Sequence, residues 1–214
     1  EIPLRLVGSE MCIRDRFSGS EAGNALADVV FGAVNPSGKL PFTFPVRLED
    51  NGAHALGEYP GADKVKYNES IFVGYRWHDK EQLKPLFAFG HGLSYTAFAV
   101  GNVKADRTTL APNGSIRISA DVTNTGDRAG AEVVQLYIGD EQSSLPRPVK
   151  ELKGFQKVSL NPGQTRTVTF EITPGMLQYY DDAKGAWVAE PGAFTAYVGA
   201  ASDDIRGTVE FELK

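Results

Sequence analysis

The sequence contains a single cysteine, Cys12, and only three histidines, His54, His78 and His91. One thiol cannot form an internal disulfide, and these histidines lack the spacing of zinc ligands. We therefore expect no disulfide-stapled fold, no metal site and no cofactor, and we assign no metal-binding or cofactor-binding residue. The absence of disulfides fits a cytosolic protein and equally an exported bacterial one, so it leaves the compartment open.

Basic clusters and long apolar runs are also missing. The chain has 22 Lys and Arg against 27 Asp and Glu, and its formal net charge at pH 7 is −5. Nucleic acids bind clustered Lys and Arg, so such a partner is not expected. The longest apolar stretch, residues 24–34, contains Asp28 and is too short to span a bilayer about 30 Å thick. We expect a soluble protein with neither a nucleic-acid nor a membrane partner.

What is present is an ordinary globular composition. The 214 residues are 42% hydrophobic, which is enough for one large or two small domains. Residues 1–16 show neither strand nor helix periodicity, and "VGSEMCIRDR" resembles translated read-through of a sequencing adapter. We predict that residues 1–16 are a non-native segment. An intact upstream reading frame with the same stretch would contradict this interpretation.

A helix is predicted where order begins. Ser18 and Glu21 have the spacing of a capping box, and Gly32 can end the helix in a left-handed conformation. The apolar face of this helix consists of Ala22, Ala25, Leu26, Val29 and Val30. Residues 35–38 then predict a turn, and residues 39–45 predict an extended edge strand because their two prolines exclude a central one.

The next part of the chain changes character twice. Residues 46–70 are rich in Gly, Asp, Glu and Asn without periodicity, which predicts a long surface loop. Residues 70–79, "SIFVGYRWHD", are rich in β-branched and aromatic residues and predict a strand.

From about residue 99 onward, strands alternate with turn residues at a spacing typical of a β-sandwich. In the first strand, one face carries Ile116, Ile118, Ala120 and Val122. The other predicted strands are residues 131–140, 149–158, 165–172, 185–190, 193–200 and 207–213. The missing cysteine pair excludes an immunoglobulin domain proper but fits fibronectin type III architecture. The predicted fold class is therefore mainly β.

The stretch "GLSYT" comes within one residue of the G-x-S-x-G nucleophile elbow and follows His91. Thr96 replaces the second glycine, and a triad histidine normally comes from a distant segment, so Ser94 is not predicted to be catalytic. We interpret this stretch as the turn between two domains. In that turn, Gly90 and Gly92 would supply unusual φ angles and the Ser94 hydroxyl would bond local backbone.

Structural roles are favoured for the acidic candidates as well. Glu21 is explained by the capping box better than by acid chemistry near a sugar. Four acidic pairs could suggest general-acid catalysis, but adjacent residues point in different directions, and solvated turns are favoured. These pairs are Glu49-Asp50, Asp140-Glu141, Asp181-Asp182 and Asp203-Asp204.

Two further groups of residues leave alternatives open. The first could stack on a sugar or bond its hydroxyls, although domain-interface packing is favoured. It consists of Glu69, Tyr75, Arg76, Trp77 and His78. The second, Arg147 and Lys150, could be a ligand patch. Pro146 and Pro148 instead favour a stiff, exposed crossover between the two sheets.

Six blocks in order resemble the C-terminal third of glycoside hydrolase family 3, the bacterial β-glucosidase and β-xylosidase group. They are "EAGNALADVVFGAVNPSGKLPFTFP", "YNESIFVGYRWHD", "PLFAFGHGLSYTAF", "VTNTGDRAGAEVVQLYI", "PRPVKELKGFQKVSLNPGQT" and "WVAEPGAFTAYVGA". The resemblance implies the C-terminal remnant of an α/β sandwich domain plus linker in residues 17–98. It implies a fibronectin type III-like domain in residues 99–214. Ser70 stands where glycine is usual, so that turn is strained if its backbone needs a positive φ.

The resemblance to this family implies a retaining glycosidase. The family's aspartate nucleophile lies on a (β/α)₈ barrel and its glutamate acid/base lies on the α/β sandwich domain, with the two carboxyl groups about 5–5.5 Å apart. The resemblance places both outside this segment, so no catalytic residue is assigned.

Two functions follow from these observations. The first is the C-terminal fragment of a retaining β-glycosidase that removes terminal β-linked glucose or xylose from oligosaccharides. The fragment would act as a structural scaffold and be inactive alone. The family resemblance favours a periplasmic or extracellular location. The alternative is a free-standing β-sandwich module for carbohydrate binding or adhesion. A lone sandwich would have no use for the helix and the "NPSGKLPFTFP" segment, which argues against this alternative. Neither sugar preference nor oligomeric state follows from the sequence.

Overall fold

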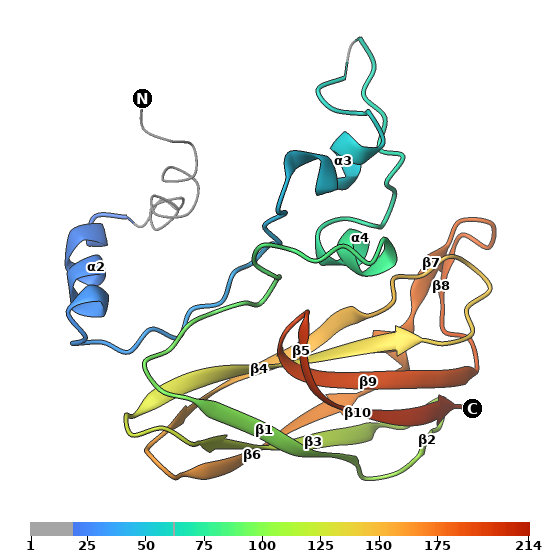
Figure 1. Cartoon of the computed structure of the whole chain (residues 1–214). Coiled ribbons are helices and arrows are strands. Elements are labelled where there is room, and N and C mark those ends of the chain that lie inside the picture. The colour runs from blue at the N-terminus through green and yellow to red at the C-terminus, as the bar shows by residue number, and fades with distance from the viewer. Residues whose placement is uncertain (1–18, 62) are drawn as a thin grey trace. The chain divides into compact units, whose positions relative to one another are not determined.

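The computed structural model describes residues 19–61 and 63–214 and divides between Asn35 and Pro36 into two compact units. The predicted non-native segment 1–16 and Ser18 lie outside the described residues. Helix α2 belongs to the first unit, and the other described elements belong to the second (Figure 1). No helix within the described ranges combines the length and the apolarity needed to cross a membrane.

Helix α2 spans Ala22–Val30, so the predicted helix is present but starts later than expected. Glu21 is its N-cap and not its third residue, and the predicted capping box is therefore wrong. The physical reason is Gly19, whose φ of +77° cannot belong to a right-handed helix. Asn24 Nδ2 instead donates a hydrogen bond to the Glu21 carboxylate at 2.6 Å. Gly32, with φ of +78°, ends the helix as predicted.

The segment that precedes the sandwich contains short helices where the sequence predicted a loop and a strand. They are η2 (Leu48–Asp50), α3 (Gly52–Ala55) and α4 (Tyr75–Lys80). The predicted edge strand 39–45 is reduced to one antiparallel bridge, in which Phe44 N donates to Phe87 O at 2.8 Å. The predicted 46–70 surface loop is wrong for the residues that form η2 and α3.

Helix α4 replaces the strand predicted for residues 70–79. Gly74 adopts φ of +61° as the N-cap of this helix, which buries Trp77 and His78. Because strand propensity reflects fit to a half-buried sheet, a sequence rich in aromatics follows the packing available to it. Ser70 has φ of +55°, which confirms that a non-glycine residue stands at a left-handed position of this turn.

The second unit is built on a sandwich of two sheets, which Figure 1 shows as two layers. The smaller sheet has the order β1 (Phe98–Ala105), β3 (Ile116–Asn124) and β6 (Thr165–Ile172). The larger sheet has the order β2 (Thr109–Leu110), β10 (Asp204–Leu213), β9 (Gly192–Ala201), β4 (Gly130–Asp140) and β5 (Glu151–Leu160). Strand β2 runs parallel to β10, and the other pairs are antiparallel.

A separate hairpin projects from the sandwich. It consists of β7 (Tyr179–Asp181) and β8 (Ala186–Val188), which follow the short helix η3 (Pro174–Leu177). The sequence predicted β8 as a strand of the sandwich itself and did not predict β1, β2 or β7. Residues 141–150 join β4 to β5 within one sheet, so the predicted crossover between sheets is wrong.

The core lies between the two sheets and confirms the predicted alternation along β3. Every inward-facing apolar side chain of that strand is at most 1% exposed: Ile116, Ile118, Ala120 and Val122. They face buried residues of the larger sheet such as Leu136, Val198 and Phe211. Burial of each large aliphatic side chain contributes about 1.5–3 kcal/mol, so this cluster is the main source of the stability of the sandwich.

Candidate functional site

Helix α4 lies against the larger sheet, and Tyr75 makes its main contact. The Tyr75 ring stacks on Phe89 with centroids 5.0 Å apart and meets the edge of Tyr137 at 5.7 Å. Leu152 N donates a hydrogen bond to the Tyr75 hydroxyl at 2.9 Å. Tyr137 is fully buried, and its hydroxyl donates to the Gln135 side chain. These contacts are those of packing against the sandwich, the role favoured from the sequence.

Two ion pairs reinforce this contact. Arg76 Nη2 lies 3.1 Å from Glu151 Oε1, and Lys150 Nζ lies 2.6 Å from Asp79 Oδ2. Burial raises the pKa of Asp79, and the hydrogen bond and charge of Lys150 only partly offset that rise. Asp79 is therefore a carboxylate held by a partner rather than a free nucleophile.

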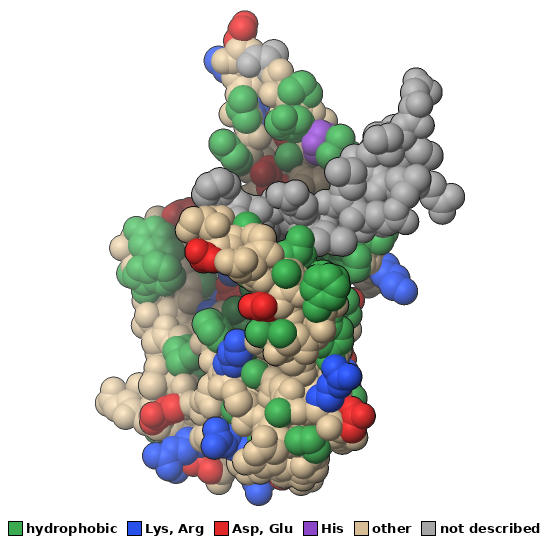
Figure 2. Space-filling model, turned by 90° about the vertical axis from the view of Figure 1, so that its left-hand side faces the viewer, with side chains coloured by type: hydrophobic (Ala, Val, Ile, Leu, Met, Phe, Trp, Pro, Cys, Tyr) green, Lys and Arg blue, Asp and Glu red, His purple; other side chains and the backbone are tan. Residues whose placement is uncertain are grey.

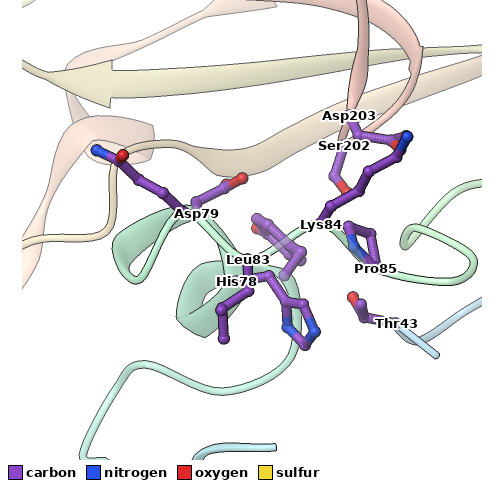
Figure 3. Close-up of a pocket in the computed structure, with 10 residues that line it drawn as sticks. Thr43, His78, Asp79, Leu83, Lys84, Pro85, Ser202 and Asp203 are labelled. Carbon is purple, nitrogen blue, oxygen red and sulfur yellow. The ribbon is translucent and has the colours of Figure 1, made fainter. Parts of the chain in front are cut away.

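A pocket of about 370 Å³ lies beside this contact, and Figure 3 shows the residues that line it. His78 and Asp79 come from α4, and Asp203 comes from the turn between β9 and β10. His78 Nδ1 lies 3.1 Å from Gly74 O, and because a carbonyl oxygen only accepts, Nδ1 carries a proton. Nε2 of His78 and Oγ1 of Thr43 are buried and have no hydrogen-bond partner among the described residues.

The pocket is lined by two acids, Asp79 and Asp203, and Asp79 is paired with Lys150. The proton-bearing nitrogen of His78 bonds backbone, so this imidazole is not aligned by a carboxylate as in a hydroxyl–imidazole–carboxylate relay. A retaining glycosidase needs one free carboxylate and one carboxylic acid about 5–5.5 Å apart, and Asp79 is committed to Lys150. The pocket can therefore donate and accept hydrogen bonds, but the described contacts supply no reaction.

The "GLSYT" stretch is a turn, as expected. Thr96 N donates to Ser94 Oγ at 3.3 Å, and the His91 ring lies 5.3 Å from the ring of Phe87. Gly90 has φ of +81°, as predicted, and a Cβ there would overlap the Gln135 side chain. The expectation for Gly92 is wrong, because it has no positive φ. It is small because a Cβ would lie 2.5 Å from Gly38 O.

One residue of each predicted acidic pair bonds local backbone or a neighbouring cation, and the prediction of solvated turns is wrong for Asp50 and Asp181, which are buried. Asp50 accepts hydrogen bonds from the backbone N and Nη2 of Arg47, both at 3.1 Å. Asp181 accepts from Ala183 N at 3.0 Å, and the Lys184 side chain, followed by backbone hydrogen bonds, lowers the pKa of Asp181. Asp204 is paired with Arg206.

The side chains of Arg147 and Lys150 are each only 9% exposed, so the prediction of an exposed segment is wrong for both. Arg147 lies 3.4 Å from Asp140 and 2.8 Å from Glu151, and its guanidinium lies 5.0 Å from the centre of the Tyr179 ring. Burial disfavours the charge of Glu151, but its cationic partners outweigh this effect and lower its pKa.

A groove of about 640 Å³ runs beside these residues and was missed from the sequence. We call it the hairpin groove. Residues that line it include Phe72, Arg76, Arg147, Glu151, Tyr180 and Trp187. They come from three separated segments, so no local motif could have identified them. The sequence offered Arg76 and Arg147 separately as possible ligand contacts, and for the hairpin it offered a pair of aromatic residues in the polar stretch "YDDAKGAW".

Two family models match the chain. The model described as the glycosyl hydrolase family 3 C-terminal domain matches residues 12–95, and the model of a fibronectin type III-like domain matches residues 132–202. Among curated proteins, the chain is 53% identical over 203 residues to Beta-glucosidase BoGH3A of Bacteroides ovatus, covering 94% of this chain and 27% of that protein. It is 48% identical over 188 residues to Thermostable beta-glucosidase B of Acetivibrio thermocellus, covering 87% and 25%.

Solved structures give the same result. The GH3 beta-glucosidase of Bifidobacterium adolescentis superposes with a TM-score of 0.83 at 38% identity, covering 90% of this chain and 28% of that chain. The beta-glucosidase of Kluyveromyces marxianus, solved in complex with glucose, gives 0.82 at 43% identity, covering 91% and 23%. The chain thus spans about a quarter of the length of the relatives that it matches.

Proposed function

Because the chain belongs to glycoside hydrolase family 3, whose C-terminal region it matches, we propose that it is the structural scaffold of a β-glycosidase. The whole protein would remove terminal β-linked glucose or xylose from oligosaccharides with retention of configuration. Residues 17–98 would complete an α/β sandwich domain, and residues 99–214 would support it.

The distribution of apolar surface supports the scaffold role. Most exposed large hydrophobic side chains lie before the sandwich, including Phe31, Phe42, Tyr67, Val73 and Leu93. The side chains of this kind that lie in the sandwich are fewer. In Figure 2, hydrophobic side chains gather in the upper part of the face shown, whereas Lys, Arg, Asp and Glu are more frequent in its lower part. Large exposed apolar surfaces mark interaction sites, so the segment before the sandwich is the surface that a preceding part of the protein would cover.

The state of the carboxylates supports a role without chemistry. Asp79 and Glu151, two largely buried acids near α4, each bond a largely buried cation, whereas the buried Oε2 of Glu69 has no hydrogen-bond partner among the described residues. A nucleophile and an acid/base catalyst that act as a pair must differ in protonation and face the same sugar carbon. We therefore place the reacting carboxyls in a preceding part of the protein.

Hydrolysis assays test this proposal. The 214-residue chain should not hydrolyse aryl β-glucosides or aryl β-xylosides, whereas the whole protein should hydrolyse at least one of them and release the β-anomer first. Turnover by the purified chain, or an α-anomer as the first product of the whole protein, would refute the respective part of the proposal.

The exposed apolar surface argues against the free-standing module. A self-sufficient sandwich would not need residues 36–97, which contribute most of that surface. Stable, monodisperse behaviour of residues 99–214 together with sugar affinity would support the module instead.

A further inference from the structure

The β7–β8 hairpin carries two aromatic rings that the core does not use. Tyr180 and Trp187 are paired across the strands, and their ring centroids lie 5.7 Å apart at an interplanar angle of 68°. They remain 49% and 65% exposed. Because successive side chains of a strand point to opposite faces, Tyr179 and Asp181 turn inward and are buried. The hairpin therefore presents two non-parallel aromatic faces to solvent.

The wall beside these rings is polar, rigid and nearly balanced in charge. The Glu151 carboxylate forms ion pairs with Arg147 at 2.8 Å, Arg76 at 3.1 Å and Lys153 at 3.4 Å. Asp140, behind Arg147, and Asp182, in the lining, supply further negative charge. Held in this way, the donors and acceptors lose little conformational freedom when a ligand binds. With cations and anions nearly equal in number, the wall has no strong preference for a polyanion.

The segment that leads into α4 also lines the groove. Ser70, Ile71 and Phe72 line it, and Lys80 Nζ lies 4.8 Å from the centre of the Phe72 ring. The groove, at about 640 Å³, falls within the range of about 300–1,000 Å³ that small-ligand sites occupy. It is open enough along the hairpin for rings to be reached from solvent, as the exposure of Trp187 shows.

A ligand for this groove needs an apolar face for the rings and hydroxyl groups for the charged wall, and it must be neutral. Pyranose rings meet these requirements, because their axial C–H groups form a flat apolar face and their hydroxyls lie at the rim. We propose that the hairpin groove binds a neutral β-linked gluco-oligosaccharide, with sugar rings stacked on Trp187 and Tyr180. The choice of β-linked glucose rests on the proposed function, whereas the sugar class rests on the groove itself.

Tryptophan fluorescence tests this proposal directly. The chain contains two tryptophans, Trp77, which is 6% exposed, and Trp187. Titration of the 214-residue chain with cellotriose should give a saturable change in emission that is lost in Trp187→Phe. Calorimetry should show that Trp187→Phe still binds, whereas Trp187→Ala and Tyr180→Ala bind about tenfold more weakly because each loses a stacking face.

Matched controls make the result decisive. Phe155 is an aromatic residue on β5 that is 67% exposed and lies outside the groove, so Phe155→Ala should bind like the unaltered chain. Thermal unfolding should show that each variant remains folded, since all these rings are exposed. Absence of saturable cellotriose binding, or equal affinity of Trp187→Ala and Phe155→Ala, would overturn the sugar site. Equal affinity for maltotriose would overturn the β-linkage.

The same titration separates this proposal from the proposed function. Cellotriose binding by the chain, combined with a whole protein that does not hydrolyse aryl β-glycosides, would refute only the glycosidase. Hydrolysis by the whole protein without cellotriose binding by the chain would refute only the groove.

Discussion

Removal of one partner of the Lys150–Asp79 pair should destabilise the second unit strongly. Lys150 Nζ lies 2.6 Å from the Asp79 carboxylate, and the two side chains are 9% and 20% exposed. Loss of one member of a fully buried pair costs roughly 3–5 kcal/mol, because the other charge stays buried without a partner. Since Asp79 keeps some contact with water, we expect Lys150→Met to lower the free energy of unfolding by about 2–4 kcal/mol.

Replacement of both partners should cost far less than the sum of the single changes. The raised pKa of Asp79 indicates that burial outweighs the favourable effect of Lys150, so the pair contributes little net stability. We expect the double variant Lys150→Met/Asp79→Leu to lie within about 1 kcal/mol of the unaltered chain, which gives a coupling energy of at least about 2 kcal/mol.

Urea unfolding measures these free energies, with emission of Trp77 in a Trp187→Phe background as a probe within α4. The exposed pair Lys214–Glu212 provides the control, and Lys214→Met should change stability by no more than about 1 kcal/mol. Protonation of Asp79 removes its unpaired charge, so the cost of Lys150→Met should be smaller near pH 4 than at pH 7. A cost below about 0.5 kcal/mol at pH 7, in the range of ordinary surface changes, would refute this reasoning.

Three further results are expected from unfolding measurements. Ser70→Gly should stabilise the chain by up to about 1 kcal/mol, because φ of +55° is strained for serine, and a loss of stability would contradict this. Gly90→Ala should lower stability by at least about 1 kcal/mol, since φ is +81° and the new Cβ would overlap Gln135; an unchanged thermal midpoint would contradict it. Glu151 has a lowered pKa, so its charge stabilises the fold at pH values above its ordinary pKa of 4.5. This stabilisation is lost as the pH falls through the folded-state pKa of Glu151. The unaltered chain should therefore lose more stability than Glu151→Gln between about pH 5 and pH 3, and parallel pH curves would contradict this.

The sandwich was predicted from the sequence because its rules are local. Period-two alternation identified the buried face of β3, and the predicted bounds of β6, residues 165–172, agree with the structure. Strands β1 and β2 were not predicted, because their neighbours in space, and not their own pattern, make them strands. Burial of Trp77 likewise decided the helical state of α4 against its β-rich composition.

The candidate sites were harder to predict because they combine distant segments. The role of Arg147 depends on Asp140, Glu151 and Tyr179, and prolines beside it suggested an exposed connection instead. The hairpin groove likewise joins residues near positions 72, 147 and 187. By contrast, Ser94 was correctly interpreted, because its hydrogen bond is with a residue two positions away.

The contact between Tyr75 and Tyr137 means that the folding unit of the sandwich begins before its first strand, β1. Gly90 O accepts from Gln135 Nε2, and Phe89 O accepts from Ser202 N, so residues that precede β1 seal the outer side of the larger sheet. A recombinant sandwich that begins at residue 99 would expose the phenol of Tyr137 and the side-chain amide of Gln135 to solvent. Protein engineers who transplant this module should carry the stretch from Gly74 onward as part of it.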